Sequence, residues 1–250
     1  MTLVISTQSL QADTVTKVFV AQVENQIFKD KVEALGRLRA NESVELMSTV
    51  TERVKAIYFD DAQRIKKGTL LLEMEIEEEL AALEEQNAIL EEATRQVKRF
   101  TPLIANGSVS KTNLDQSKLE VATANARINA IKSQIDERRI VAPFDGLMGL
   151  RNISVGTMLS SDTLIATIHD DSVMKLDFSL PSLFLSVLKP GIKIKAKTDA
   201  LPKKVVHGKI SHIDTQIESI TRTIMVRALI NNADHTLKPG LLMQVTLETN

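Results

Sequence analysis

The sequence predicts a mainly β protein that is interrupted near its middle by a long α-helical hairpin. Residues up to about 74 and from 140 onward form short apolar or alternating runs separated by turns, whereas residues 75–139 follow a helical period. In addition, the strand-rich stretches on the two sides of the helical block align with each other at a shift of 94 residues. These three observations together predict two β modules and one inserted rod.

Composition excludes several classes of function. The 250 residues carry 31 basic and 32 acidic side chains, no Cys and no Trp, which excludes thiolate metal sites and gives no bias toward nucleic acid. No apolar run reaches the ~20 residues needed to cross a bilayer. The N-terminus lacks the pattern of a signal peptide, so we expect either a cytoplasmic chain or a targeting segment that is missing from this sequence.

The first block, to about Met74, is predicted to form short strands. Its β-branched and apolar runs are Val15–Val23, Val44–Val50, Val54–Phe59 and Leu70–Leu72. Polar turns separate these runs, so each reads as one strand.

The middle block is predicted to be an antiparallel helical hairpin with a coiled-coil seam on both legs. The first seam steps by four and three residues through Ile76, Leu80, Leu83, Asn87, Leu90, Thr94, Val97 and Thr101. The second steps by three and four through Leu114, Ser117, Val121, Ala124, Ile128, Ile131 and Ile135. Between the legs, Asn106-Gly107 can end one helix and Ser110 can cap the next. Pro102 is expected to kink or locally open the first leg.

The internal repeat brackets this hairpin. The aligned pairs are Val54 with Met148, Phe59 with Ile153, Ala62 with Gly156, Ile65 with Leu159 and Leu70 with Leu164. Each copy, of about 28 residues, is too short to bury a core alone. We therefore expect the two copies to pack on each other as one sandwich.

The last block is predicted to form a small antiparallel barrel, because several of its strands have one apolar and one polar face. The apolar faces are Ile192, Ile194 and Ala196 (between Lys193, Lys195 and Lys197), then Ile224, Val226, Ala228 and Ile230, and finally Met243, Val245 and Leu247. Turn signals such as Pro190-Gly191 and Pro239-Gly240 separate them.

No catalytic, cofactor-binding or metal-binding residue is predicted. His207 and His212 are five apart in an expected strand, which would place them on opposite faces, and the methionines lie mostly in apolar strands as core residues. The phosphate-binding, nucleophile-elbow and zinc-protease motifs are all missing from the sequence. The acidic run from Glu73 to Glu85 suits a solvated helix start.

Several motifs resemble the periplasmic adaptors, or membrane fusion proteins of the HlyD-like family, that serve tripartite efflux pumps. They are Ile140-Val141-Ala142-Pro143-Phe144-Asp145-Gly146, Val155-Gly156-Thr157, Leu180-Pro181, Thr221-Arg222-Thr223-Ile224 and Leu237-Lys238-Pro239-Gly240. The resemblance implies a lipoyl-like β-sandwich in two halves (44–74 and 140–170), a hairpin (75–139) and a six-stranded β-barrel (28–43 and 171–250). Residues 1–27 would belong to an incomplete membrane-proximal region, whose strand at Val15–Val23 we expect to be loosely held or to pair elsewhere.

The resemblance also implies a site and partners. Arg99, Leu103 and Ser110 have the spacing of the family's docking motif for the outer-membrane channel, while Glu52 and Ala62 stand where the family usually has glycine. The implied function is a non-enzymatic periplasmic link, associated with the inner membrane, between a transporter of the resistance–nodulation–division (RND) class and that channel. Six copies would assemble for the export of drugs or other small molecules, without cofactor or nucleic acid.

Two alternatives stay open. One is an adaptor of an ABC-type exporter with a similar hairpin. The other is a lipoyl or biotinyl carrier subunit of an enzyme complex, against which the stretch Leu72–Ile76 speaks because it contains no lysine.

Overall fold

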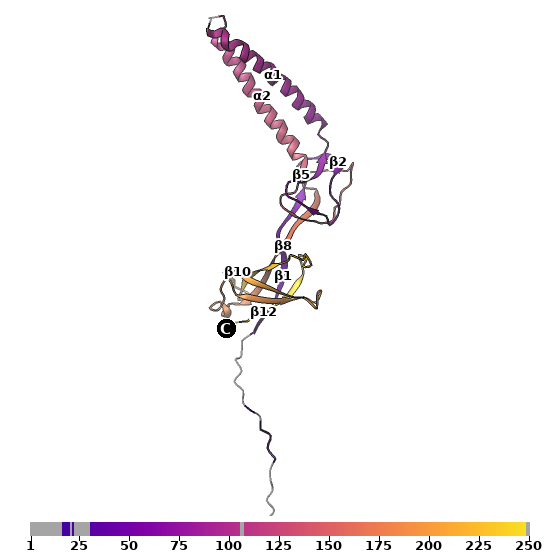
Figure 1. Cartoon of the computed structure of the whole chain (residues 1–250), viewed down its shortest axis with the longest axis vertical. Helices are drawn as coiled ribbons and strands as arrows, with labels where there is room; N and C mark the ends of the chain where they lie inside the picture. The colour runs from indigo at the N-terminus through magenta and orange to yellow at the C-terminus, as the bar shows by residue number, and fades with distance from the viewer. Residues whose placement is uncertain (1–16, 21, 23–30, 106–107, 249–250) are drawn as a thin grey trace, which may run out of the picture.

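The computed structural model describes residues 17–20, 22, 31–105 and 108–248. The described chain is elongated, with a helical rod at one end, a ring of strands at the other and a smaller β unit between them (Figure 1). Residues 17–20 and 22 carry no strand, and the rest of the strand expected at Val15–Val23 lies outside the described residues.

The ring consists of six antiparallel strands. In spatial order these are β1 (Lys31–Met47), β12 (Leu242–Glu248), β9 (Lys193–Lys197), β10 (Val205–Glu218), β11 (Thr223–Asn231) and β8 (Leu164–Pro181). The ring closes because β8 also pairs with β1, so that Gly36 lies opposite Phe178 on one side and Met243 on the other. A closed sheet has no free edge for pairing with another chain.

Apolar side chains that alternate with exposed ones along the strands fill the interior of the ring, as the sequence predicts. Ile194 and Ala196 are buried while the lysines between them are exposed. The apolar faces of β11 and β12 are buried as well, and with residues of β1 and β8 they form one hydrophobic cluster. The predicted apolar faces are thus confirmed.

The middle unit, which we call the split β unit, is built from chain on both sides of the rod. Its strands are β2 (Glu52–Ile57), β3 (Arg64–Ile65), β4 (Leu70–Met74), β5 (Arg139–Val141), β6 (Gly146–Met148) and β7 (Met158–Leu159), with the adjoining ends of β1 and β8. Side chains from both halves share a second hydrophobic cluster, which includes Leu71, Leu72, Leu159 and Ile165. The ranges predicted for the domains stay predictions.

The 94-residue repeat is visible as paired backbone hydrogen bonds. Gly68 donates to the carbonyl of Ala142 at 2.8 Å, and Asp162, 94 residues after Gly68, donates to the carbonyl of Ser48 at 2.9 Å. Because Ser48 and Ala142 are themselves 94 residues apart, each half holds the turn of the other half by the same bond. The two copies therefore pack as equivalent partners, as the alignment predicts.

Backbone angles repeat in the same way. Ala62 and Gly156 have φ values of 57° and 86°, and Gly68 and Asp162 have 80° and 68°. Both pairs occupy the left-handed region, which glycine enters readily and alanine does not. Ala62 thus keeps the turn geometry of its glycine counterpart, although it lacks the residue type that suits that geometry.

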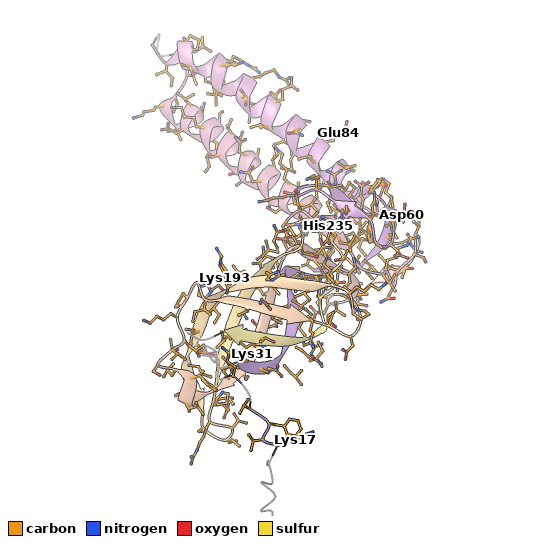
Figure 2. The ribbon with its side chains drawn as sticks, turned by 60° about the horizontal axis from the view of Figure 1, so that its bottom comes forward. Lys17, Lys31, Asp60, Glu84, Lys193 and His235 are labelled. Carbon is orange, nitrogen blue, oxygen red and sulfur yellow. The ribbon has the colours of Figure 1, made fainter. Side chains whose placement is uncertain are left out.

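The ring and the split β unit meet at a polar cluster around the buried carboxylate of Asp171. Arg64 on β3 donates from Nη1 and Nη2 to the two carboxylate oxygens of Asp171 on β8, each at 3.0 Å, and Nδ1 of His235 lies 3.1 Å from the same carboxylate. Figure 2 shows His235 at this junction. Burial would raise the pKa of Asp171, but the hydrogen bonds and charge of Arg64 outweigh it and lower that pKa. The cluster joins residues that are far apart in sequence, and no local pattern predicts it.

Candidate functional site at the hairpin tip

The rod is an antiparallel pair of helices, α1 (Glu77–Ala105) and α2 (Lys111–Glu137), that extends away from the split β unit (Figure 1). With 29 residues, α1 is about 43 Å long at ~1.5 Å per residue. The predicted seam of α2 is confirmed: all seven of its positions are buried or half-buried. Ser117, its polar member, is satisfied by donating from Oγ to the carbonyl of Asn113 at 3.1 Å.

The seam of α1 differs from the prediction at three positions. The predicted members that are buried or half-buried are Ile76, Leu83, Leu90, Thr94 and Val97, whereas Leu80, Asn87 and Thr101 are exposed. The residues one position before Asn87, Thr94 and Thr101 are buried or half-buried, and these are Gln86, Ala93 and Phe100. Ala93 and Phe100 bury apolar groups, which favours this register, although Oε1 of Gln86 is buried without a hydrogen-bond partner among the described residues. Only Ala93 among them is fully buried, at 4% exposure.

At the tip, Ser110 is the N-cap of α2. Its Oγ accepts a hydrogen bond from the amide of Thr112 at 3.1 Å, which satisfies one of the free amides of the first turn. On the other side of the turn, the amide of Ser108 donates to the carbonyl of Leu103 at 3.1 Å. Helix α1 continues as helix through Pro102 to Ala105. The intervening residues 106 and 107 lie outside the described residues.

Arg99 and Leu103 lie one helical turn apart on α1, close to this turn. The guanidinium of Arg99 is 62% exposed and comes only within 3.8 Å of Oε1 of Glu92. Glu92 is instead paired with Arg95 at 2.7 Å, and that hydrogen bond is the main reason why the pKa of Glu92 is lowered. The fork of Arg99 is therefore free to bind a partner group, beside the half-buried Leu103.

The three predicted site residues thus all lie at the end of the rod. Arg99 and Leu103 are on the last turns of α1 and Ser110 begins α2. The hydroxyl of Ser110 has a structural role in capping, whereas the side chain of Arg99 has only a weak internal contact.

At the base of the rod, Arg138 makes contacts that sequence reasoning did not find. Its Nη2 lies 2.8 Å from Oε1 of Glu79 on α1, and its Nε lies 3.9 Å from Oε2 of Glu52 on β2. Its carbonyl accepts the amide of Met74 at 3.0 Å. Arg138 therefore ties both helices to the split β unit and helps to set the direction of the rod. The one feature of the sequence that could have indicated this contact is Glu52, an acidic residue at a position where the resembled family usually has glycine.

The predicted opposite orientation of His207 and His212 is wrong. A register shift in β10 between Ile210 and His212 adds one residue to the strand, so both imidazoles lie on the exposed face. Among the described residues there is no group of His, Asp and Glu that could hold a metal ion. Within the same residues, no helix is long and apolar enough to span a membrane.

Comparison with known proteins identifies the family. Residues 75–141 match the family described as the RND membrane fusion protein (MFP) α-helical hairpin domain, and residues 176–250 match the CusB-like β-barrel domain. The chain belongs to the membrane fusion proteins of the RND type. The strands between residues 31 and 74 and the chain between 142 and 175 lie outside these two matches.

Curated relatives agree with this membership. The chain is 30% identical over 234 residues to an uncharacterised protein of Haemophilus influenzae, covering 92% of this chain and 61% of that one. It is also 30% identical over 228 residues to the multidrug resistance protein MdtA of Escherichia coli, covering 82% of this chain and 55% of MdtA. The chain thus spans about 55–61% of the length of these relatives.

Two solved structures have the same fold. One is a MacA–MexA chimera that contains the hairpin of Pseudomonas aeruginosa MexA, with a TM-score of 0.80 and 21% identity, covering 89% of this chain and 82% of the chimera. The other is the membrane fusion protein Spr0693 of Streptococcus pneumoniae, with a TM-score of 0.72 and 17% identity, covering 88% of this chain and 99% of that one.

Proposed function

We propose that this chain is the adaptor part of a tripartite efflux pump, which links an RND-type transporter of the inner membrane to an outer-membrane channel. It would lie in the periplasm beside the inner membrane and act without catalysis, and the pump would export drugs or other small molecules. The observation that carries the proposal is the rod itself, whose exposed tip presents Arg99 and Leu103 at the far end from the ring (Figure 1).

The tip has the chemistry of a protein-docking surface. The guanidinium of Arg99 can donate a bidentate pair of hydrogen bonds to a carboxylate or to backbone carbonyls, and Leu103 adds an apolar contact on the same helical face. Ser110 keeps α2 capped up to its first residue, so the docking surface is held in a defined shape. By family resemblance, six copies would assemble so that the rods enclose the exit path.

Cross-linking in cells tests the proposal, because the chain has no cysteine of its own. Ser108→Cys places one thiol at the tip of this chain, and we expect it to capture the outer-membrane channel. Ser133→Cys, on the exposed side of α2, is the matched control and should not capture it.

Arg99→Asp should abolish capture and drug resistance without changing the melting curve, since this side chain has little role in the rod. Retained capture and resistance in that variant would refute the docking role. A separate thiol introduced at the ring end that captures an ABC-type transporter would favour the ABC exporter over the RND pump.

A further inference from the structure

The outer wall of the ring contains a groove whose composition the fold alone does not explain. Its volume of about 830 Å³ lies within the range of about 300–1,000 Å³ that is usual for small-molecule sites. The lining residues come from β8, β10 and β11, from the start of β9 and from the turn before β9, and none of them belongs to β1 or β12. The groove is therefore a feature of the wall formed by these four neighbouring strands.

One side of the groove is basic. Lys193 on β9 and Lys209 on β10 lie directly opposite each other on the exposed face, and the imidazole of His207 lines the groove on the same face of β10. Figure 2 shows Lys193 on the ring, away from the rod that carries Glu84. Like charges directly opposite each other destabilise a sheet. An anion bound between the two ammonium groups would remove this repulsion.

The two lysines have no counter-ion from this chain. Neither ammonium group forms an ion pair or a hydrogen bond with another described residue, and the described lining of the groove contains no acidic side chain. Elsewhere on the outer face of the ring, the guanidinium of Arg227 lies 2.6 Å from the carboxylate of Asp177. The groove thus leaves positive charge uncompensated on a wall where a nearby cation is paired.

The other side of the groove is apolar. Leu229 on β11 is 40% exposed, and Val173 on β8 is half-buried. Because Leu229 pairs with Lys175 and Asn231 pairs with Val173, the two apolar side chains are diagonal neighbours on one face of the sheet. Lys209 pairs with Leu229, so the apolar side begins directly beside the basic side. Adjacent strands are about 4.8 Å apart, which places Val173 about 10 Å across the sheet from Lys209.

A β-bulge lies where the groove is hollowed. The register between β10 and β11 shifts between Ile210 and His212, so that Ser211 is an extra residue on β10. Ser211 lines the groove, and its Oγ donates to the carbonyl of Arg227 at 3.0 Å. A bulge bends its strand and changes the direction of nearby side chains. The groove therefore coincides with a local bend in β10.

We propose that this groove binds one molecule of a small amphiphilic anion, such as a medium-chain carboxylate or an alkyl sulfate. The anionic head would lie between the ammonium groups of Lys193 and Lys209, and the alkyl chain would cover Leu229 and Val173. A purely ionic ligand would leave the apolar side exposed, and a purely apolar ligand would leave the lysine pair uncompensated. The short distance between the two sides fits a single ligand that has both properties. This inference goes beyond the adaptor function and does not depend on it.

Isothermal titration calorimetry of the purified chain with decanoate, kept below its micelle concentration, tests the inference. At low salt we expect saturable binding of one decanoate per chain, and added salt should weaken it. Acetate has the same carboxylate without the chain, and decyltrimethylammonium has the same chain with the opposite charge. Each of these two controls should bind at least about tenfold more weakly than decanoate.

A pair of double variants tests the basic side. Lys193→Gln/Lys209→Gln should weaken decanoate binding by at least about tenfold, whereas Lys118→Gln/Lys132→Gln makes the same charge change on the exposed face of α2 and should have no effect. Because the first change also relieves repulsion between the two strands, that variant should melt no lower than the wild type. Its loss of binding therefore cannot come from unfolding.

A pair of single variants tests the apolar side. Leu229→Ser should weaken decanoate binding by about fivefold. Met225→Ser is the control, because Met225 lies on the same face of β11 with a similar exposure of 46% but does not line the groove. Melting curves without ligand show whether both variants are folded, and decanoate should raise the melting temperature of the Met225 variant more than that of the Leu229 variant.

Three results would overturn the inference. They are the absence of saturable decanoate binding at low salt, equal binding of decanoate and decyltrimethylammonium, and an equal loss of binding in the ring and α2 lysine variants. Binding to anionic vesicles without binding of monomeric decanoate would assign the lysines to a membrane contact and would overturn it as well. Capture of the channel at the rod tip is a separate result and would be unaffected.

Discussion

The left-handed turn at Ala62 leads to a prediction about stability, and the equivalent turn at Gly156 in the other half of the repeat serves as its control. Ala62 has a φ of 57°, and its counterpart Gly156 has 86°. A Cβ destabilises the folded state by about 1–2 kcal/mol in this region. Glycine avoids that strain, but its greater conformational freedom in the unfolded chain lowers the free energy of unfolding by about 0.5–1 kcal/mol. We therefore expect Ala62→Gly to stabilise the protein by about 0.5–1 kcal/mol.

The reverse change should have the opposite sign. A Cβ added at Gly156 would meet no atom within 4 Å, so Gly156→Ala tests backbone strain without a steric clash. It should destabilise the protein by about 1 kcal/mol, which corresponds to about 2–4 °C in melting temperature for a chain of this size. Asp162→Gly is the control and should have a smaller effect than Ala62→Gly, because aspartate tolerates the left-handed region better than alanine.

Urea unfolding followed by circular dichroism measures all three variants, and the slope with urea shows whether the unfolded surface is unchanged. A destabilising effect of Ala62→Gly or a neutral effect of Gly156→Ala would refute the assignment of backbone strain to Ala62. Either result would mean that the two turns do not respond equivalently and that the structural repeat does not extend to their energetics.

Three further predictions concern the rod and the junction. Arg138→Ala should cost about 2–3 kcal/mol in urea unfolding, below the range for a fully buried pair, because it leaves Glu79 without its partner at only 12% exposure. Ala93→Asp should lower the free energy of unfolding by about 2–4 kcal/mol because Ala93 is buried, whereas Asn87→Asp should lower it by under about 0.5 kcal/mol because Asn87 is exposed. The reverse order would support the seam predicted from the sequence. The lowered pKa of Asp171 stabilises the fold above the ordinary carboxyl pKa of about 3.9, and this stabilisation is lost as the pH falls through the lower folded value. Thermal melts should therefore show the difference between wild type and Asp171→Asn shrinking below about pH 4, and a constant difference would contradict this assignment.

Periodic features could be predicted from the sequence because each depends on neighbouring residues. The seam of α2 is apolar at nearly every step, so one register is much better than its alternatives. The seam of α1 mixes Asn87 and Thr101 with leucines, and a shift of alternate layers by one residue costs little, so the sequence pattern does not decide between the registers. The choice is made by packing against α2, which no local pattern contains.

Features that depend on irregular backbone or distant contacts could not be predicted. The register shift before His212 reverses the face of that residue, although the alternation on both sides of the shift is regular. The pairing of Arg64 with Asp171 joins positions 107 residues apart. At the tip, the spacing of Arg99, Leu103 and Ser110 locates the proposed site, but the engagement of Glu92 by Arg95, which leaves Arg99 available, emerges only from the structure.

The junction between the ring and the split β unit decides how movement at one end of the molecule reaches the other. Both β1 and β8 run through it, and β1 has a register shift there, between Ala40 and Glu42. The shift would be a natural point for bending, but Asn41 donates to Asp170 at 2.7 Å and Arg64 holds Asp171 on the same strand. A change in the angle between ring and rod must therefore break charged hydrogen bonds that are partly protected from water. Because such bonds are expensive to break singly, the junction should hold one preferred angle rather than a continuous range, and the rod would transmit the orientation of the ring to its tip.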